Sequence, residues 1–458
     1  MSARESAVLI NPPSPAGATA NREGAAGLGY LDHSPQGFYY PPQTIAYVGA
    51  VLRQEGWQVR ALDAVAQRWS IQDVLASIRQ GREAVIGVFV SYDTLRGDIE
   101  FLQALKAEIP HCSVIVFGPA TRYVQKELGR TNVDGILLGE PERSFSACRF
   151  VVATSVASDT GGRLKSPLRT PAFFSPQSLG VPGYDEEGYI QGLDSLPYPA
   201  WDLLPYVRYR FLTVMGSRGC GDYCRYCPYV ATQGNRFRAR SPESIVGELA
   251  WLAEEFRPGR VVFRDPVFAW DRERVVDLCQ GILAARLHLR WECESRPEHF
   301  DEALLRLMKR AGCEGIKIGL ETTSGPLLHK LRRIETVEAA SAYREHVAAL
   351  VRICLAIGLR CRVFVMLGLP GQEQSAAQET LDWLEKIRPS ALNIKLFQAY
   401  PGIRLSAEEI KAAIPPDEAT LEVFLQVQKR LESGSGPKRG MLQEARGWLR
   451  RRIGGEAE

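Results

Sequence analysis

The sequence has no long hydrophobic run and no excess of charge of one sign. None of its 458 residues belongs to an unbroken apolar stretch of the ~18–20 residues that a membrane span needs. The N-terminus has no basic segment followed by a long apolar one, so we expect no secretory signal and a cytoplasmic location. The 56 Lys and Arg residues nearly balance the 53 Asp and Glu residues, and the net charge of +3 gives no indication of a nucleic-acid partner.

Cysteine is also scarce, since ten cysteines in 458 residues are few for a disulfide framework. Seven are scattered along the chain, and we interpret them as small buried apolar side chains: Cys112, Cys148, Cys279, Cys293, Cys313, Cys354 and Cys361. The other three lie within eight residues, at Cys220, Cys224 and Cys227. Their spacing indicates a shared chemical role.

Residues 6–140 alternate between apolar β-rich runs and amphipathic segments of helix length. The predicted strands are residues 7–10, 58–62, 84–90, 113–117 and 134–138, and the predicted helices are residues 43–54, 71–78, 97–107 and 122–128. This alternation predicts a parallel sheet covered on both faces. Five strands indicate an α/β, doubly wound (Rossmann-like) domain, whose ligand site lies at the carboxyl ends of the strands.

The turns after these strands are mostly small, polar or glycine-containing, which suits a backbone that approaches a large ligand. They are Asn11-Pro12-Pro13, Asp63, Ser91-Tyr92, Gly118-Pro119 and Gly139-Glu140. Tight turns between strands and helices have the same composition, so these turns alone do not identify a ligand.

A second alternating series follows. The predicted strands are residues 211–216, 260–265, 289–293, 315–320, 362–367 and 392–397, and the predicted helices are residues 242–255, 272–287, 301–311, 337–357 and 376–387. Six strand–helix units predict a partial (β/α)6 barrel of the TIM type, short of the eight units that close a barrel.

We divide the chain into four regions. They are a Rossmann-like domain (residues 1–145), a Pro-rich linker (146–206), the partial barrel (207–405) and a helical tail (406–458). Repeated prolines in the linker argue against regular helix or a central strand, and we expect Trp201 and Leu203 to pack against a neighbouring domain. The tail has predicted helices at residues 419–431 and 440–453. The second helix is basic, which is typical of a solvent-exposed face or of a surface that binds an acidic partner.

Three cysteines with three and two intervening residues can hold one inorganic centre. The loop that carries them follows the first strand of the second series, at the carboxyl mouth where barrel enzymes keep their sites. A structural zinc site needs four ligands, and no fourth Cys or His lies nearby. Three thiolates on a four-iron cluster leave one iron open to a substrate, and soft sulfur favours iron–sulfur over magnesium or calcium. Zinc and three unrelated thiols remain the alternatives.

The CxxxCxxC motif after the first strand of a six-unit partial barrel resembles the radical S-adenosylmethionine (SAM) superfamily. Ser217-Arg-Gly-Cys220 is similar to the family's approach to its cluster, and later strands carry similar motifs at residues 262–268, 294–296, 318–321, 368–371 and 400–402. The N-terminal domain resembles the cobalamin-binding domain of one large subgroup, on Asn11-Pro-Pro13, Tyr40-Pro-Pro42, Gly118-Pro119 and Gly139-Glu140. Residues 196–205 are similar to that subgroup's linker.

The resemblance implies three cofactors: a [4Fe-4S] cluster on Cys220, Cys224 and Cys227, SAM, and cobalamin. It implies reductive cleavage of SAM to a 5′-deoxyadenosyl radical and methyl transfer from methylcobalamin to an unactivated carbon. It also implies an external electron donor such as flavodoxin or ferredoxin. The short tail favours a small-molecule substrate over a peptide.

The resemblance further implies site residues. Tyr226 is expected near the adenine of SAM, Asp265 and Glu321 at its amino group or ribose, and Arg296 at its carboxylate. Gly368 would let the backbone approach the cofactor. The expected cobalamin edge comprises Asn11, Pro12, Ser91, Tyr92, Gly118, Gly139 and Glu140. Ordinary loop packing, a turn aspartate and a surface ion pair are the alternatives for the SAM residues.

The sequence departs from the family pattern at two places. His33 is out of spacing for a lower axial ligand, so we expect cobalamin without a protein histidine, with Tyr92 or a nearby residue facing its lower side. Gly221-Asp222 stands where the family often has proline.

Other hypotheses remain open. The chain could catalyse a radical cyclisation, rearrangement or oxidation, could use its N-terminal domain as a scaffold without cobalamin, or could be a non-catalytic cobalamin or redox sensor. Lys317, Lys395 and Gln398 would contact substrate if strand alternation turns them inward.

Overall fold

The computed structural model describes residues 5–34, 37–81, 83, 85–148, 171–414 and 416–431. Their contacts divide the chain into two compact units. Unit 1 extends to Arg210 and includes Thr232–Gly234, and unit 2 comprises the rest of the chain from Phe211 onward. Within the described part, no helix is long and apolar enough to cross a membrane. We keep the four-region division of the sequence as a proposal.

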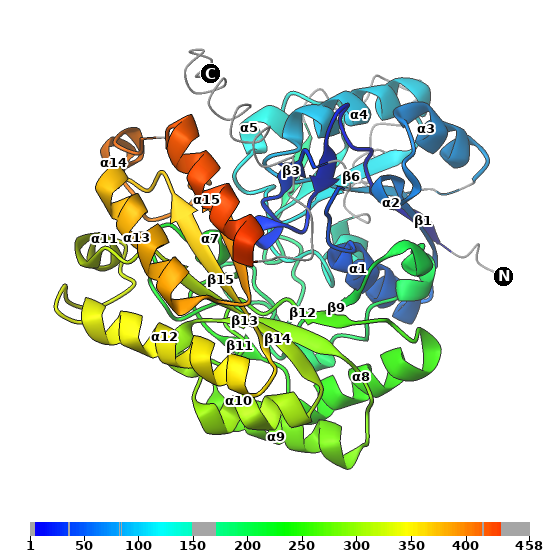
Figure 1. Ribbon diagram of the computed structural model, residues 1–458. Coiled ribbons are helices and arrows are strands. Elements are labelled where there is room, and N and C mark those ends of the chain that lie inside the picture. The colour runs from blue at the N-terminus through cyan, green and yellow to red at the C-terminus, as the bar shows by residue number, and fades with distance from the viewer. Residues whose placement is uncertain are drawn as a thin grey trace, which may run out of the picture. The chain divides into compact units, whose positions relative to one another are not determined.

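Unit 1 is built on a sheet whose described strands run parallel in the order β4-β1-β5-β6-β7-β8 (Figure 1). The strands are β1 (Ser6–Asn11), β4 (Gln58–Asp63), β5 (Val85–Phe89), β6 (Ser113–Phe117), β7 (Gly135–Leu137) and β8 (Ala172–Phe174). Every residue of β5 is buried, as a central strand covered on both faces requires. The predicted doubly wound sheet is confirmed. β8 was missed because it is short and lies at the sheet edge in the segment predicted as linker.

Helices cover both faces of this sheet. They are α1 (Gln43–Gln54), α2 (Ala64–Gln67), α3 (Ile71–Arg79), α4 (Leu95–Glu108) and α5 (Gln125–Leu128). Val8 and Ile10 pack with Phe101 of α4, whereas Leu9 faces Gly49 of α1. The helices that follow β1 and β5 therefore lie on opposite faces, and the strand order has its switch point between β1 and β5.

Between β1 and α1 the chain makes an excursion that the sequence did not predict. It contains β2 (Thr19–Asn21), the 3₁₀ turn η1 (Ala25–Gly27) and β3 (Tyr30–Asp32), with β2 and β3 antiparallel. Strands of three residues are too short to show periodicity. Asp93 N donates to Leu28 O over 3.1 Å, so the excursion covers the end of β5.

The described part of the linker contains three 3₁₀ turns: η2 (Leu193–Ser195), η3 (Trp201–Leu203) and η4 (Tyr206–Arg208). Trp201 is fully buried, and Ala200 N donates to Ala46 O of α1 over 3.0 Å. The linker end is thereby fixed on unit 1. Residues 149–170 of the predicted linker lie outside the described residues.

Unit 2 contains a second sheet, whose described strands run parallel in the order β16-β15-β14-β13-β12-β9. They are β9 (Leu212–Val214), β12 (Val261–Phe263), β13 (Trp291–Ser295), β14 (Cys313–Glu321), β15 (Arg360–Leu367) and β16 (Ala391–Leu396). A separate short ladder joins β10 (Ser217–Arg218) and β11 (Arg238–Ala239). Parallel strands in unbroken chain order confirm the predicted partial barrel.

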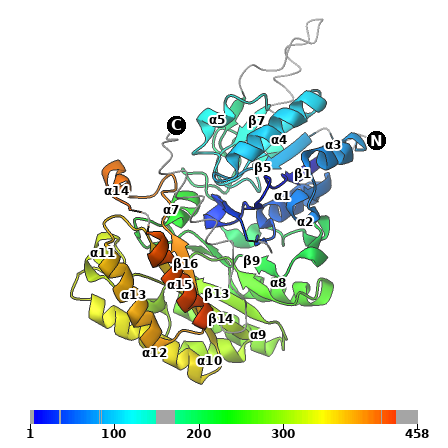
Figure 2. The same ribbon diagram turned by 45° about the horizontal axis from the view of Figure 1, so that its top comes forward.

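The helices of unit 2 follow one another around this sheet (Figure 2). They are α7 (Pro228–Gln233), α8 (Pro242–Glu255), α9 (Arg272–Ala284), η5 (Pro297–His299), α10 (Glu302–Arg310), α11 (Gly325–Lys330), α12 (Ala340–Ala356), α13 (Gln374–Ile387), α14 (Ala407–Lys411) and α15 (Glu418–Leu431). Ser241, Asp271 and Asp301 cap the first turns of α8, α9 and α10. The sequence did not predict the short helices α7, α11 and α14.

The last described helix, α15, corresponds to the helix predicted at residues 419–431. Its buried side chains Leu421, Phe424 and Val427 share one face, and α15 contacts β16 and α13. This part of the tail is therefore part of unit 2. The basic helix predicted at residues 440–453 lies outside the described residues.

Candidate functional site

Three cysteine thiols lie in one loop near the carboxyl end of β9. After the short strand β10 the chain turns at Gly219, whose φ of +74° favours glycine. The loop then passes through Cys220, Cys224 and Cys227 and ends where α7 begins. We call residues 220–227 the cluster loop. All three thiols are free, and Cys220 and Cys224 are buried.

The cluster loop places the thiols close enough for one to affect the pKa of another. Burial, then the Asp222 carboxylate and the Cys224 thiol, raise the pKa of Cys220 to about 12. Burial and then Cys224 raise the pKa of Cys227 well above its ordinary value. Among the described residues, no three His, Cys, Asp or Glu side chains converge closely enough to hold one metal ion. The loop supplies three thiols, which is the number that an iron–sulfur cluster with one open iron uses, whereas a structural zinc ion needs four ligands.

Two arginine side chains approach the sulfur of Cys224. Arg296, after β13, and Arg333, after α11, each place Nη1 3.8 Å from Cys224 Sγ. Arg296 Nη2 also donates to the carbonyl oxygen of Arg333 over 2.7 Å, which holds the two residues together. Guanidinium groups in this position stabilise negative charge on sulfur and present the planar donor pairs that carboxylates accept.

Arg333 was missed by the sequence analysis. It is 5% exposed, its Nη2 donates to the carbonyl oxygen of Gly319 over 2.5 Å, and its Nε lies 3.3 Å from the Tyr343 hydroxyl. The available signal was the Leu331-Arg332-Arg333 run after the Glu321 motif. An arginine pair is also ordinary surface sequence, and the fold alone decides which of the two turns inward.

Arg296 is oriented by two carboxylates. Its Nη1 lies 2.9 Å from Asp222 of the cluster loop, and its Nη2 lies 2.6 Å from Glu298. The unusual Gly221-Asp222 pair thereby has a structural role, because its carboxylate ties the first half of the loop to the residue after β13.

Tyr226 and Glu321, both predicted to lie near SAM, are close enough for each to affect the pKa of the other. Burial raises the pKa of Glu321, and the Arg333 guanidinium opposes that shift. Glu321 has a φ of +67°, which is strained for a residue other than glycine, beside a register shift between β14 and β15. The strained strand end aims this carboxylate at the cluster loop.

Asp265, also predicted to contact SAM, is 1% exposed and bonded to the segment that leads into the cluster loop. Its Oδ1 accepts from Gly216 N over 2.8 Å and its Oδ2 from Ser217 Oγ over 2.6 Å. Arg274 Nη2 lies 3.6 Å from Oδ2. These contacts make Asp265 a support of the loop, and its contact with SAM stays a prediction.

Apolar side chains after the later strands cover the cluster loop. Cys224 and Tyr226 pack in one buried cluster with Leu331, Leu369, Phe397, Leu405 and Ala413. Gly368, predicted to let the backbone approach SAM, has a φ of +76° and directly precedes Leu369. The packing keeps water from this side of the loop.

Arg225, between the second and third cysteines, binds the segment around α14. Its Nη1 and Nη2 lie 2.7 and 2.6 Å from the two carboxylate oxygens of Glu409. Its Nε donates to the carbonyl oxygen of Arg404 over 3.1 Å, and Arg404 N donates to Arg225 O over 2.8 Å. We call these contacts the α14 clasp. The sequence placed Glu409 in a tail, and the structure gives it a direct contact with the cluster loop.

The three residues predicted to contact substrate differ in exposure. Lys317 is half-buried, with Nζ 3.8 Å from Glu292 Oε2 on β13, Lys395 on β16 is exposed, and Gln398 is half-buried. Along β13 and β15 the half-buried residues alternate with fully buried ones, as expected of strands with one face under helices. The other face carries charged side chains suited to a polar substrate.

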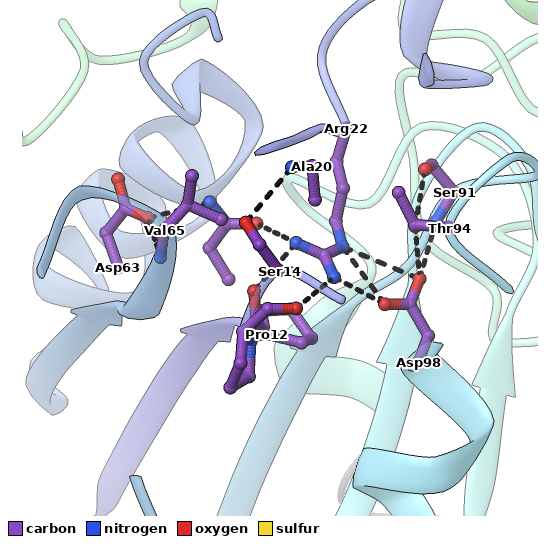
Figure 3. A network of polar contacts seen from close by, with 11 residues as sticks. Pro12, Ser14, Ala20, Arg22, Asp63, Val65, Ser91, Thr94 and Asp98 are labelled. Atoms are coloured by element: carbon purple, nitrogen blue, oxygen red, sulfur yellow. Dashed lines mark hydrogen bonds and ion pairs between the residues drawn. The ribbon is translucent and has the colours of Figure 1, made fainter. Parts of the chain in front are cut away.

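The residues predicted to bind cobalamin lie at the carboxyl edge of the unit 1 sheet. Asn11, Pro12 and Ser91 are buried there. Figure 3 shows Arg22 and Asp98 bridging the loops that carry Pro12 and Ser91. These predicted residues are held by protein groups rather than left open.

The linker holds a further part of this edge. Glu140 is buried and accepts from the backbone N–H of Ile190 over 2.6 Å. Gly139, with a φ of +90°, has no room for a Cβ beside the carbonyl group of Gly188. Gly118, with a φ of +137°, is buried and packs as closely against the end of β5.

Tyr92 keeps open surface at this edge, with 37% of the residue exposed. Burial of its remainder, and then the Asp93 carboxylate, raise its pKa. His33 lies in the excursion, where its Nδ1 is 3.1 Å from Gly17 O. A switch-point edge with an exposed tyrosine fits a large flat ligand such as cobalamin.

Two family models match the chain. Residues 214–384 match the radical SAM superfamily, and residues 35–149 match the B12 binding domain. The first match spans β9 to α13 and includes the cluster loop. The second spans α1 to the turn after β7 and includes most of the unit 1 edge.

The chain is also similar to named proteins. It is 24% identical to the uncharacterized methyltransferase PH0819 of Pyrococcus horikoshii, over 80% of this chain and 77% of that protein. It is 24% identical to the hopanoid C-3 methylase of Methylococcus capsulatus, over 79% and 67%. A solved structure of the radical SAM methyltransferase TsrM from Kitasatospora setae, with cobalamin and a [4Fe-4S] cluster bound, matches with a TM-score of 0.65 and 19% identity, over 91% of this chain and 80% of that one. The structural match shows a shared fold.

Proposed function

We propose that this chain, which carries a radical SAM domain behind an N-terminal B12-binding domain, is a cobalamin-dependent radical SAM methyltransferase. The observation that carries the proposal is the cluster loop, with three thiols beside the mouth of a partial barrel and two arginines at one sulfur. Methyltransferases and methylases are prominent among its relatives, which supports methyl transfer over the other radical outcomes.

The chemistry that the cofactors supply is reductive cleavage of SAM at the cluster and a transferable methyl group on cobalamin. Cys220, Cys224 and Cys227 would bind three irons of the cluster, which leaves the fourth iron for SAM. The edge around Tyr92 and Gly139 would hold cobalamin, without a ligand from His33.

The residues around the cluster loop would then bind and orient SAM. Arg333 can donate to the SAM carboxylate beside Cys224 while it stabilises charge on the sulfur. Arg296, whose Nη atoms already bind Asp222 and Glu298, would donate to that carboxylate by exchanging one of these partners. Tyr226 and Glu321 lie near each other beside the adjacent strand end, where they would contact the adenosine part of SAM. Asp265 fixes the entry to the loop, so that the thiols keep one geometry.

The proposal extends to the class of substrate and to the source of electrons. We infer a small polar substrate, because the unit 2 sheet turns charged side chains such as Lys317 and Lys395 away from its helices. Cleavage of SAM consumes one electron, and we infer an external donor of the flavodoxin or ferredoxin type.

The test is anaerobic turnover. Protein loaded with iron, sulfide and hydroxocobalamin is incubated with methyl-labelled SAM, a strong reductant and small-molecule fractions of the native host. We expect 5′-deoxyadenosine and a labelled product by mass spectrometry. The control is the Cys220→Ala/Cys224→Ala/Cys227→Ala variant, which should yield neither.

Other outcomes separate the alternatives. Protein that forms 5′-deoxyadenosine but retains no corrin would be a radical SAM enzyme with a scaffold domain. Protein that retains corrin but does not cleave SAM would be a sensor. Cleavage of SAM by the triple variant would refute the proposed cluster.

A further inference from the structure

A continuous chain of polar contacts crosses the carboxyl edge of the unit 1 sheet, and Figure 3 shows its part around Arg22 and Asp98. It joins Asp98, Arg22, Asn11, Asp63 and Tyr209 in that order. We call these five residues the edge network. Asn11 was predicted as a cobalamin ligand, whereas Arg22 and Asp98 were assigned no role by the sequence.

Arg22, in the excursion, uses all three of its side-chain nitrogens. Its Nη1 donates to Pro12 O over 2.7 Å and to Asn11 Oδ1 over 3.0 Å, and its Nη2 donates to Pro13 O over 3.2 Å. Nη2 and Nε both bind Asp98, at 2.5 and 3.2 Å. One planar guanidinium thus holds three acceptors of the loop after β1 and one carboxylate of α4.

Asp98 extends the network to the loop after β5. Its Oδ2 accepts from Thr94 Oγ1 over 2.6 Å and from Ser91 N over 3.3 Å. Ser91 Oγ in turn lies 2.7 Å from Thr94 Oγ1. The backbone of Ser91, which directly precedes the exposed Tyr92, is therefore fixed by the same carboxylate that binds Arg22.

Asn11 extends the network to β4 and to the segment that follows the linker. Its Nδ2 donates to Asp63 Oδ1 over 2.8 Å, and Asp63 Oδ2 accepts from the Tyr209 hydroxyl over 2.7 Å. Asp63 also caps α2 through the N–H groups of Val65 and Ala66. One set of contacts thereby joins the ends of three neighbouring strands to Tyr209, which also belongs to unit 1.

The position of the Arg22–Asp98 pair is the switch point of the sheet. β1 and β5 are neighbours, and the helices after them lie on opposite faces. In doubly wound sheets this is the position at which ligands bind. The pair has side-chain exposures of 1% and 0%. A buried ion pair contributes little net stability because desolvation offsets its attraction, so its main effect here is on geometry.

We propose that the edge network is the positioning frame of the cobalamin edge, with Arg22 as its central positioning residue. The proposal rests on the proposed function, since it assigns the frame to the cobalamin site. Arg22 sets the loop after β1 and the Ser91–Tyr92 backbone in one arrangement, and the ligand contacts themselves come from neighbouring groups on the two loops.

The test compares cobalamin affinity with fold stability. Arg22→Lys keeps a charge for Asp98 but cannot reach the three acceptors of the β1 loop. We expect the variant to remain folded at the temperature of the binding measurement, with a lowered thermal midpoint because buried acceptors lose their donor. We expect the dissociation constant for hydroxocobalamin to rise by about tenfold or more. Arg96→Lys, at an exposed arginine of α4, is the matched control and should change neither quantity.

A second variant keeps the test informative if the first is unstable. Arg22→Met/Asp98→Asn removes both charges, so no buried charge is left unpaired. We expect it to be at least as stable as Arg22→Met alone and to bind hydroxocobalamin as poorly as Arg22→Lys. An affinity that follows the thermal midpoint across these proteins, or that is unchanged in both variants, would overturn the frame.

Failure of the proposed function has a different result. If the unsubstituted protein retains no corrin, the cobalamin part of the function is wrong and the frame proposal falls with it. If the unsubstituted protein binds corrin and the variants bind it equally, the frame alone is wrong.

Discussion

At the scale of single residues, the sulfur of Cys224 is the point where the site's charges meet. The guanidinium groups of Arg296 and Arg333 both reach this sulfur. Carboxylates also bind Arg296, and the carbonyl group of Gly319 binds Arg333. Arginine suits this position because its planar fork binds a carbonyl oxygen and a sulfur at once, whereas a lysine ammonium is a point charge.

We therefore predict that Arg333→Lys lowers SAM cleavage by about 10–100-fold, as the loss of a supporting contact at a metal site does. Iron content should stay unchanged because the three thiols are intact. The measurements are iron per chain and the rate of 5′-deoxyadenosine formation. Arg332→Lys, at the exposed neighbour, is the control, and an equal loss in both variants would contradict a specific role for Arg333.

Asp265 is a predicted SAM contact whose observed hydrogen bonds support the segment that leads into the cluster loop. Because its carboxylate is buried against Gly216, Ser217 and Arg274, Asp265→Asn would leave Arg274 without its charge partner. We predict a loss of about 3 kcal/mol in the free energy of unfolding, measured by urea denaturation. Unchanged stability together with lost SAM binding would instead make Asp265 a ligand.

At the scale of elements, segments far apart in the sequence surround the cluster loop. Arg225 contacts Glu409 beyond the last strand of the sheet. Leu369 and Phe397 reach the loop from the ends of β15 and β16, and Leu331 reaches it from the end of α11. The parallel sheet makes this possible because all its strands end at the same edge. The residues that cover the cluster loop thus lie in the segments between the helices and strands rather than in the strands themselves.

The α14 clasp leads to a prediction about retention of the cluster. Glu409→Gln should speed loss of iron to a chelator by about two- to fivefold, the effect expected of a partly exposed ion pair. The decay of cluster absorbance under anaerobic chelation measures it. Glu408→Gln, one residue earlier and also in the first turn of α14, should behave as the unsubstituted protein does. Equal rates in all three proteins would show that the clasp does not protect the loop.

At the scale of the whole molecule, the two candidate cofactor sites belong to different units. The cluster loop lies in unit 2 and the edge network in unit 1, and each is held by contacts within its own unit. The two sets of contacts share no residue, so loss of one cofactor should leave binding of the other unchanged.

This independence is testable with the triple cysteine variant. Cys220→Ala/Cys224→Ala/Cys227→Ala should contain no cluster iron and yet retain hydroxocobalamin with unchanged affinity. Arg22→Lys should show the converse, with full iron content and weakened corrin binding. Iron is measured by colorimetry and corrin by absorbance after gel filtration. Loss of corrin in the triple variant would show that the units bind their cofactors as one.

The sequence by itself determined the two parallel sheets and the cluster loop. Strand–helix alternation and the spacing of three cysteines are local patterns, and each is written in consecutive residues. The same holds for Glu321, which directly follows a predicted strand, and for Arg296, which lies three residues after another. β8, β2 and β3 were missed because each has three residues and none lies in a longer apolar run, as β7, β9 and β12 do.

The tertiary structure alone decided which polar residues face a ligand and which hold the frame. Asn11, Ser91 and Asp265 have the side chains of ligands, but their hydrogen bonds run to Arg22, Thr94 and Ser217. Arg333 and Glu409 meet the cluster loop across more than one hundred positions of chain. Such pairings depend on where separate strands end in space, and no periodicity or spacing in the sequence encodes that position.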